Sequence, residues 1–222
     1  MVKIDLAYHC LKWVINVGGR REKVKVKLAK SLMEIEKNLL EKYKDRYTNP
    51  NLIPRLDKVV INYSAGADAT KLEKARKILE SIFGRTLCAV RARKTIHAWG
   101  VRKGKHHGWK LTLRGEEAYQ WLKKLMKVID YTVYEGQMDK YGNFSFGIKE
   151  HIEIPGVKYI PELGIIGFDV CVSFRRNGYR VSERRLRKSK IPERHRVKKE
   201  DVILFLKEMG ITVKPGVRPA EE

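Results

Sequence analysis

Four stretches of the chain alternate apolar and polar residues with the two-residue period of a strand that buries one face. They cover residues 57–63, 109–114, 144–148 and 166–174, and residues 86–95 form a fifth, less regular stretch. In the first, Val59, Ile61 and Tyr63 fall on one side and Lys58, Val60 and Asn62 on the other. The pattern predicts strands in all five places.

Apolar residues at helical spacing predict four helices, over about 30–46, 70–83, 116–128 and 199–209. Thr70 and Glu73 have the spacing of a capping box at the start of the second helix. Gly84 follows its last turn and supplies a stop, because glycine adopts the left-handed conformation that ends many helices.

Strands and helices that do not alternate as regular βαβ units predict an α+β fold, with one largely antiparallel sheet, its helices on one face and the other face open. Only Asp169 adds an acid to the open side. An open face has to be polar in any case, but such faces usually mix acids with bases. The residues predicted on the open side are Lys58, Asn62, Arg91, Arg93, Lys110, Thr112, Arg114, Ser145 and Lys149.

Charge strengthens the case for a functional face. The 222 residues carry 48 Lys and Arg against 26 Asp and Glu, a net charge of +22. Three windows hold this excess: residues 20–30, 85–114 and 175–199, of which the second contains nine basic residues and no acid. A field of one sign repels itself, so it indicates a polyanionic partner, and nucleic acid is the partner we expect. A membrane surface would require an amphipathic helix with exposed apolar residues, which these windows lack.

The chain has no run of about 18 to 20 apolar residues and its first residues do not read as a secretion signal, so we expect neither a membrane protein nor a secreted one. Cys10, Cys88 and Cys171 are widely spaced and odd in number. This spacing indicates a reducing compartment rather than a disulfide framework.

No catalytic constellation is visible, and we expect no cofactor and no metal. His106 and His107 are adjacent and therefore point apart, in a loop whose positive charge opposes a cation. Glu116 and Glu117 occupy the first turn of a predicted helix, where acids favour the dipole. Two rivals stay open on the residues alone: an RNA-processing enzyme, which would need an acid–base pair near the basic loop, and a DNA-binding chromatin protein.

Five blocks of sequence, in order, resemble one family. They are Lys94-Thr-Ile-His-Ala-Trp-Gly-Val-Arg-Lys-Gly104, Lys110-Leu-Thr-Leu-Arg-Gly-Glu116, Tyr141-Gly-Asn-Phe-Ser-Phe-Gly-Ile-Lys-Glu-His-Ile-Glu-Ile-Pro-Gly156, Ile166-Gly-Phe-Asp-Val-Cys-Val172 and Arg187-Lys-Ser-Lys-Ile-Pro-Glu-Arg-His-Arg196. The chain resembles the universal ribosomal protein L five family of the large subunit, in its archaeal or eukaryotic type, over about residues 32–212. The family's Gly-Gln-Pro after the first core helix is replaced by Gly84-Arg-Thr-Leu87, and residues 1–30 match nothing in it.

The resemblance implies a structural protein of the central protuberance, cytoplasmic and within the ribosome. It would bind 5S rRNA and anchor it to the large-subunit rRNA. Further implied partners are the P-site tRNA, neighbouring ribosomal proteins of the 5S particle and a protein of the small-subunit head. We expect a basic N-terminal extension (1–30), one α+β RNA-binding domain (31–212) and a C-terminal tail (213–222).

Pattern and resemblance together give three candidate sets. The predicted 5S rRNA contacts are Lys58, Asn62, Arg91, Arg93, Lys94, Lys110, Thr112, Arg114 and Gly115. The tRNA-facing loop implied by the resemblance contains His97, Trp99, Arg102, Lys103, Lys105, His106 and His107. The other predicted rRNA contacts are Arg175, Arg176, Arg184, Arg185, Arg187, Lys188, Lys190, Arg194 and Arg196.

Overall fold

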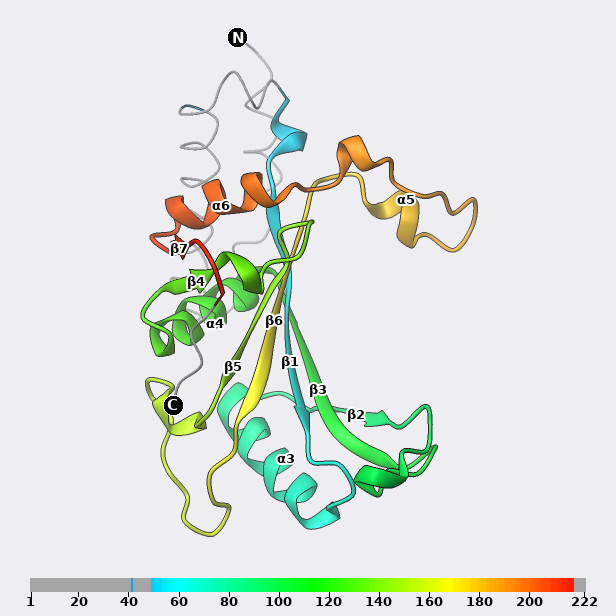
Figure 1. Cartoon of the computed structure of the whole chain (residues 1–222), viewed down its shortest axis with the longest axis vertical. Helices are drawn as coiled ribbons and strands as arrows, with labels where there is room; N and C mark the ends of the chain where they lie inside the picture. The colour runs from blue at the N-terminus through cyan, green and yellow to red at the C-terminus, as the bar shows by residue number, and fades with distance from the viewer. Residues whose placement is uncertain (1–40, 42–48, 218–222) are drawn as a thin grey trace, which may run out of the picture. The chain divides into compact units, whose positions relative to one another are not determined.

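A computed structural model describes residue 41 and residues 49–217 of the chain (Figure 1). The predicted basic extension over 1–30 lies outside the described residues, and so does the predicted helix over 30–46 apart from Glu41.

The core of the described region is a five-stranded antiparallel sheet in the order β2-β3-β1-β6-β5. This confirms the predicted α+β class. Strand β1, the first along the chain, lies in the middle of the sheet, between β3 and β6. The strands are β1 (Arg55–Ser64), β2 (Cys88–Arg91), β3 (His106–Arg114), β5 (Phe144–Ile148) and β6 (Phe168–Arg175).

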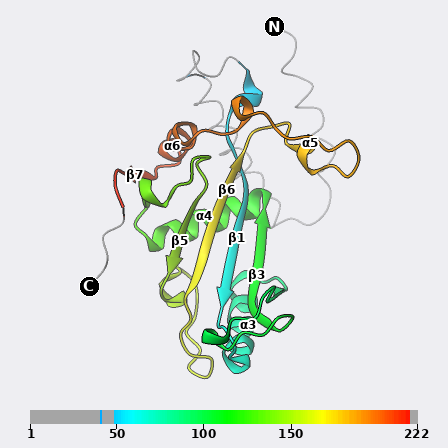
Figure 2. The same cartoon turned by 45° about the vertical axis from the view of Figure 1, so that its right-hand side comes forward.

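Helices α3 (Ala69–Phe83) and α4 (Gly115–Val128) pack against one face of this sheet and lie behind it in Figure 2. The apolar half of each alternating strand is buried, because it lies on the covered face of the sheet. The buried strand residues are Val59, Ile61, Leu111, Leu113, Phe144, Phe146, Ile148, Phe168, Val170, Val172 and Phe174.

The ends of α3 depart in part from prediction. The helix begins at Ala69, so Thr70 lies inside its first turn and the predicted capping box is wrong. Asp68 precedes the helix and forms an exposed ion pair with Lys71 at 3.0 Å. Gly84 ends the helix as predicted, with a φ of 62° and its N–H donated to the carbonyl of Glu80.

Beyond the main sheet, the chain builds a smaller layer, of which sequence patterns predicted the helix but not the strands. Strands β4 (Thr132–Tyr134) and β7 (Thr212–Lys214) pair in parallel. Helix α6 (Lys199–Glu208) packs beside them, and its Phe205 meets Phe174 of β6 edge to face, with 5.6 Å between ring centroids. The short elements are α5 (Arg180–Glu183) and the 3-10 turns η2 (Pro50–Leu52), η3 (His97–Trp99), η4 (Glu135–Gln137), η5 (His151–Glu153) and η6 (Glu193–His195).

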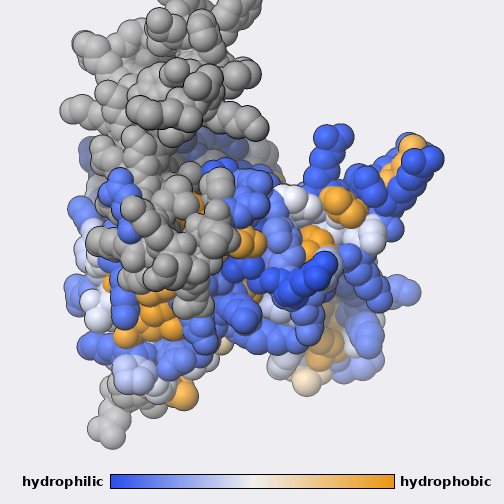
Figure 3. Space-filling view, turned by 90° about the horizontal axis from the view of Figure 1, so that it is seen from above, coloured by the Kyte–Doolittle hydropathy of each residue, from blue (hydrophilic) through white to orange (hydrophobic). Residues whose placement is uncertain are grey.

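The described surface visible in Figure 3 is mostly hydrophilic, with apolar residues in small patches. None of the described helices combines the length and the hydropathy needed to cross a bilayer.

Candidate nucleic-acid interface

The open face of the sheet carries polar residues in register across its strands. Directly opposed residues of antiparallel strands project from the same face, so the pairing fixes which side chains are neighbours. This confirms that Lys58, Asn62, Lys110, Thr112 and Arg114 share the face opposite the helices. The cross-strand rows are Arg114–Lys58–Ser173, Thr112–Val60–Cys171–Ser145 and Cys88–Lys110–Asn62–Asp169–Gly147.

These side chains differ in how far they reach into solvent. Lys110 and Arg114 are exposed, whereas Lys58, Asn62 and Thr112 are half-buried among their cross-strand neighbours. A half-buried polar group on a strand has few orientations available, so its donors and acceptors are held in place. The open face therefore combines mobile cationic ends with fixed hydrogen-bonding groups.

Asp57 is a site residue that alternation could not identify. Alternation from Val59 would turn Asp57 toward the helices, but the β1–β6 register shifts between Leu56 and Lys58, and the bulge changes the direction of the side chain. The Asp57 Oδ1 atom lies 3.0 Å from Nη1 of Arg114 and 3.1 Å from Nε of Arg175. One carboxylate thus orients two arginines, and the Arg114 side chain remains 56% exposed.

Gly115 lets the chain turn from β3 into α4 without burying Arg114. Its φ of +65° belongs to the left-handed region, where a side chain would be strained. Arg114 before it is extended and still belongs to the sheet, while Glu116 and Glu117 take the first turn of α4. The predicted Arg-Gly pair is therefore a junction between the open face and the helix layer.

Two predicted members of the open face lie elsewhere. Cys88, and not an arginine, stands across from Lys110 on β2. Arg91 follows a register shift at the end of that strand, opposite His106, and Arg93 comes after the strand has ended. Their predicted place on the open side is wrong, because Cys88 and Val90 hold that side of β2, whose pairing is interrupted before Arg91 and which ends there.

The basic loop, residues 92–105, is closed by backbone hydrogen bonds. The N–H of Ala92 donates to the carbonyl of Lys105. Ile96 and Val101, on either side of η3, exchange backbone hydrogen bonds as an antiparallel β-bridge. Five of the predicted loop residues, His97, Trp99, Arg102, Lys103 and Lys105, are exposed to solvent, and Trp99 is 70% exposed. His106 and His107 belong to strand β3 rather than to the loop, contrary to prediction.

The basic arm, residues 176–198, carries most of the third basic window. Figures 1 and 2 show it extending away from the sheet around α5. Arg176 does not reach solvent, because its guanidinium is buried and Nη2 lies 2.5 Å from Oδ2 of Asp201. It therefore leaves the set of predicted RNA contacts. The exposed predicted contacts on the arm are Arg184, Arg185, Arg187, Lys188, Lys190 and Arg194.

The one open-face group with a shifted pKa is a thiol, as far as the described residues go. Burial, together with the nearby negative charge of Asp169, raises the pKa of Cys171 above its usual 9.0. A thiol in this state is neutral near pH 7 and a poor nucleophile. The chemistry that the face offers is hydrogen bonding and charge neutralisation.

A one-sided cationic sheet with two basic projections is typical of a protein that binds nucleic acid. Comparison with known proteins agrees. Residues 49–102 match the ribosomal protein L5 family, and residues 106–205 match the C-terminal part of the same ribosomal protein family.

Archaeal relatives match along most of the chain, and each bears the name large ribosomal subunit protein uL5. The protein of Methanoregula boonei is 45% identical over 152 residues, which cover 68% of this chain and 92% of the relative. That of Sulfolobus acidocaldarius is 42% identical over 162 residues, covering 72% and 91%. That of Archaeoglobus fulgidus is 44% identical over 165 residues, covering 74% and 92%.

The chain therefore belongs to the uL5 family of ribosomal proteins, as its sequence motifs predicted. It is a structural protein of the large ribosomal subunit, found in the cytoplasm, and not an enzyme.

Proposed function

We propose that the open face binds 5S rRNA and that the protein anchors this RNA to the large-subunit rRNA in the central protuberance. The observation that supports this most directly is the cross-strand register, which groups Lys58, Asn62, Lys110, Thr112 and Arg114 on one rigid surface. The lysines and Arg114 neutralise phosphates, which sets affinity. Asn62 and Thr112 offer hydrogen bonds that set the position of a folded RNA on the face.

The basic loop and the basic arm have separate roles in this proposal. They leave opposite ends of the sheet in Figure 1, the loop beside the end of β1 and the arm beyond the end of β6. The loop reaches the P-site tRNA, and the arm contacts the large-subunit rRNA. Family resemblance supports neighbouring proteins of the 5S particle and a protein of the small-subunit head as the protein partners.

The test compares arginines on the two sides of the sheet. Arg114→Ala is expected to weaken binding of isolated 5S rRNA about tenfold, the usual effect of losing one well-placed arginine. Arg85→Ala is the matched control, because Arg85 forms an exposed ion pair with Glu117 of α4. Filter binding at fixed salt measures both. Equal effects from the two substitutions would contradict an RNA site on the open face.

A second measurement separates the loop from the face. Replacing Arg102, Lys103 and Lys105 by Gln removes the loop's charge and keeps the backbone bonds that close it. Affinity for isolated 5S rRNA should stay within about twofold, while tRNA binding to reconstituted ribosomes should weaken. Loss of 5S binding from this variant would refute the division of roles. Competition with duplex DNA at matched salt tests the chromatin alternative.

A further inference from the structure

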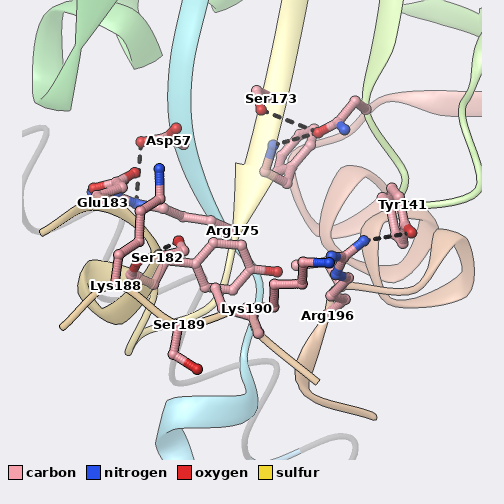
Figure 4. A pocket seen from close by; sticks show the side chains of 15 residues that line it. Asp57, Tyr141, Ser173, Arg175, Ser182, Glu183, Lys188, Ser189, Lys190 and Arg196 are labelled. Carbon is pink, nitrogen blue, oxygen red and sulfur yellow. Dashed lines mark hydrogen bonds and ion pairs between the residues drawn. The ribbon is translucent and has the colours of Figure 1, made fainter. Parts of the chain in front are cut away.

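A cavity of about 590 Å³ opens between the end of the open face and the basic arm (Figure 4). Asp57, Ser173 and Arg175 of the sheet form one wall, and Tyr179, Lys188 and Lys190 of the arm form another. Ser173 belongs to the same cross-strand row as Lys58 and Arg114. The cavity is therefore continuous with the proposed RNA surface.

The basic side chains of the cavity differ in whether they form ion pairs with acidic side chains. Arg175 is held by Asp57 and by Glu183, whose Oε1 lies 3.4 Å from its Nη1. Lys188 and Lys190 are exposed, and neither forms an ion pair with an acidic side chain in the part of the chain that the structure describes. Two ammonium groups on the rim of a cavity favour an anionic ligand, such as a phosphate.

The wall also presents a hydrogen-bond donor of fixed orientation. The Oδ1 atom of Asn143 accepts the backbone N–H of Phe174 at 3.0 Å and the hydroxyl of Ser173 at 3.2 Å. A backbone N–H can donate only to the amide oxygen, so the bond to Phe174 also fixes the amide nitrogen. The Nδ2 group has no hydrogen-bond partner among the described residues, and Asn143 lines the cavity.

Aromatic rings complete the lining. Tyr179 is half-buried, and the centroid of its ring lies 6.2 Å from the centroid of the His195 ring. Tyr141 closes another side, with its hydroxyl 2.6 Å from Nη1 of Arg196, whose guanidinium also lies over the ring. Figure 4 shows the hydrogen bond between Tyr141 and Arg196 beside the cavity.

We propose that this cavity holds one unstacked nucleotide of the bound rRNA. Its volume falls within the range of about 300–1,000 Å³ typical of small-ligand sites. Proteins recognise RNA mainly through splayed-out bases that stack on aromatic side chains. The base packs beside Tyr179 and accepts a hydrogen bond from Nδ2 of Asn143, and Lys188 and Lys190 bind its phosphate. This inference rests on the proposed function, because the nucleotide belongs to one of the two rRNAs that the protein is proposed to bind.

The first experiment crosslinks intact ribosomes with ultraviolet light and finds the nucleotide adducts by mass spectrometry. Cys88 and Cys171 on the open face report on the proposed 5S surface, and Tyr179 reports on the cavity. We expect adducts at both places. Adducts on the open face with none at the cavity overturn the nucleotide site and leave the proposed function intact. Adducts at Tyr179 with none on the cysteines support the nucleotide site and contradict 5S rRNA binding on the open face.

The second experiment measures the affinity of the full chain for 5S rRNA and for large-subunit rRNA. Tyr179→Leu should weaken binding to one of the two about tenfold, since stacking of one base contributes that much. Tyr159→Leu, at an exposed tyrosine that is not part of the cavity lining, should change neither. Lys188→Gln with Lys190→Gln should weaken the same RNA, and these exposed positions do not endanger folding. Unchanged affinity for both RNAs in both cavity variants overturns the proposal.

Discussion

The buried ion pair between Arg176 and Asp201 joins the start of the basic arm to helix α6. The two residues are 8% and 1% exposed, so neither charge is solvated by water. Removing Asp201 leaves the Arg176 charge buried without a counter-charge, which costs more than the pair contributes.

Asp201→Ala should therefore lower the free energy of unfolding by about 3–5 kcal/mol. Arg176→Met combined with Asp201→Leu should restore most of this loss, because no buried charge remains. Urea denaturation of the wild type, Asp201→Ala and the double variant measures both effects. A loss of less than about 1 kcal/mol in Asp201→Ala would show that water reaches Arg176.

His151 links the stability of the protein to pH. Its side chain is 2% exposed, and its Nδ1 accepts the backbone N–H of Ile166 at 3.3 Å. Burial lowers the pKa of His151 below its usual 6.5. The unfolded chain therefore takes up a proton as the pH falls below 6.5, while the folded protein resists it.

Stability should be fully present above pH 6.5 and should decline below it, by at most about 1.4 kcal/mol per pH unit from this group. His151→Gln keeps an acceptor for Ile166 and removes the titration, so its stability should change less between pH 7.5 and pH 5. His97→Gln, at an exposed position, should follow the wild type. Equal pH slopes in all three proteins would exclude His151 as the source.

At the scale of elements, the base of the basic loop depends on close approach of two strands. Gly108 of β3 pairs with Ser64 of β1 and with Val90 of β2. A Cβ atom at this position would lie 2.5 Å from the carbonyl oxygen of Tyr63. Only glycine allows this pairing without a shift of backbone.

Gly108→Ala should lower the free energy of unfolding by about 1–3 kcal/mol, the usual cost of overpacking. It should also speed amide exchange at Ala65, whose N–H donates to the carbonyl of His107. Gly147→Ala in β5 is the control, because a Cβ there would stay 3.4 Å from its nearest neighbour, Oδ1 of Asp169. Similar destabilisation by both substitutions would contradict the steric argument.

Elements with several turns or several alternations were predicted well from sequence, and short ones were not. Strands β1, β3, β5 and β6 and helices α3, α4 and α6 lie where periodicity predicted them, within a few residues. Three-residue strands such as β4 and β7 are too short to show a period, so their pairing depends on tertiary contacts.

Residues of the candidate site were also predicted well where strand pairing is regular and poorly where it is not. Lys58, Asn62, Lys110 and Thr112 follow from alternation, because regular pairing preserves it across the sheet. Asp57 was missed and Arg91 was misplaced, since each stands beside a register shift that sequence does not reveal. The burial of Arg176 could not be foreseen, because its partner lies 25 residues further along the chain.

For the whole molecule, the charge distribution makes RNA binding depend on salt. Two of the three basic windows that hold the charge excess, residues 85–114 and 175–199, contribute to the open face, the loop and the arm. If about six to ten phosphates are neutralised, affinity for 5S rRNA should fall about a thousandfold or more between 50 and 200 mM salt. Titration at four or five salt concentrations gives the slope, and a flat response would argue against phosphate neutralisation.

Strand β1 is synthesised early, but its pairing on both edges is completed only late in synthesis. Its partner β6 begins at Phe168, more than a hundred residues after β1, although the two run side by side in the finished sheet. During synthesis the apolar side of β1 can be covered by α3 and α4, but its second edge stays without a partner until β6 emerges. A nascent chain at that stage is exposed to aggregation, so a chaperone that shields the free edge would improve its yield in cells.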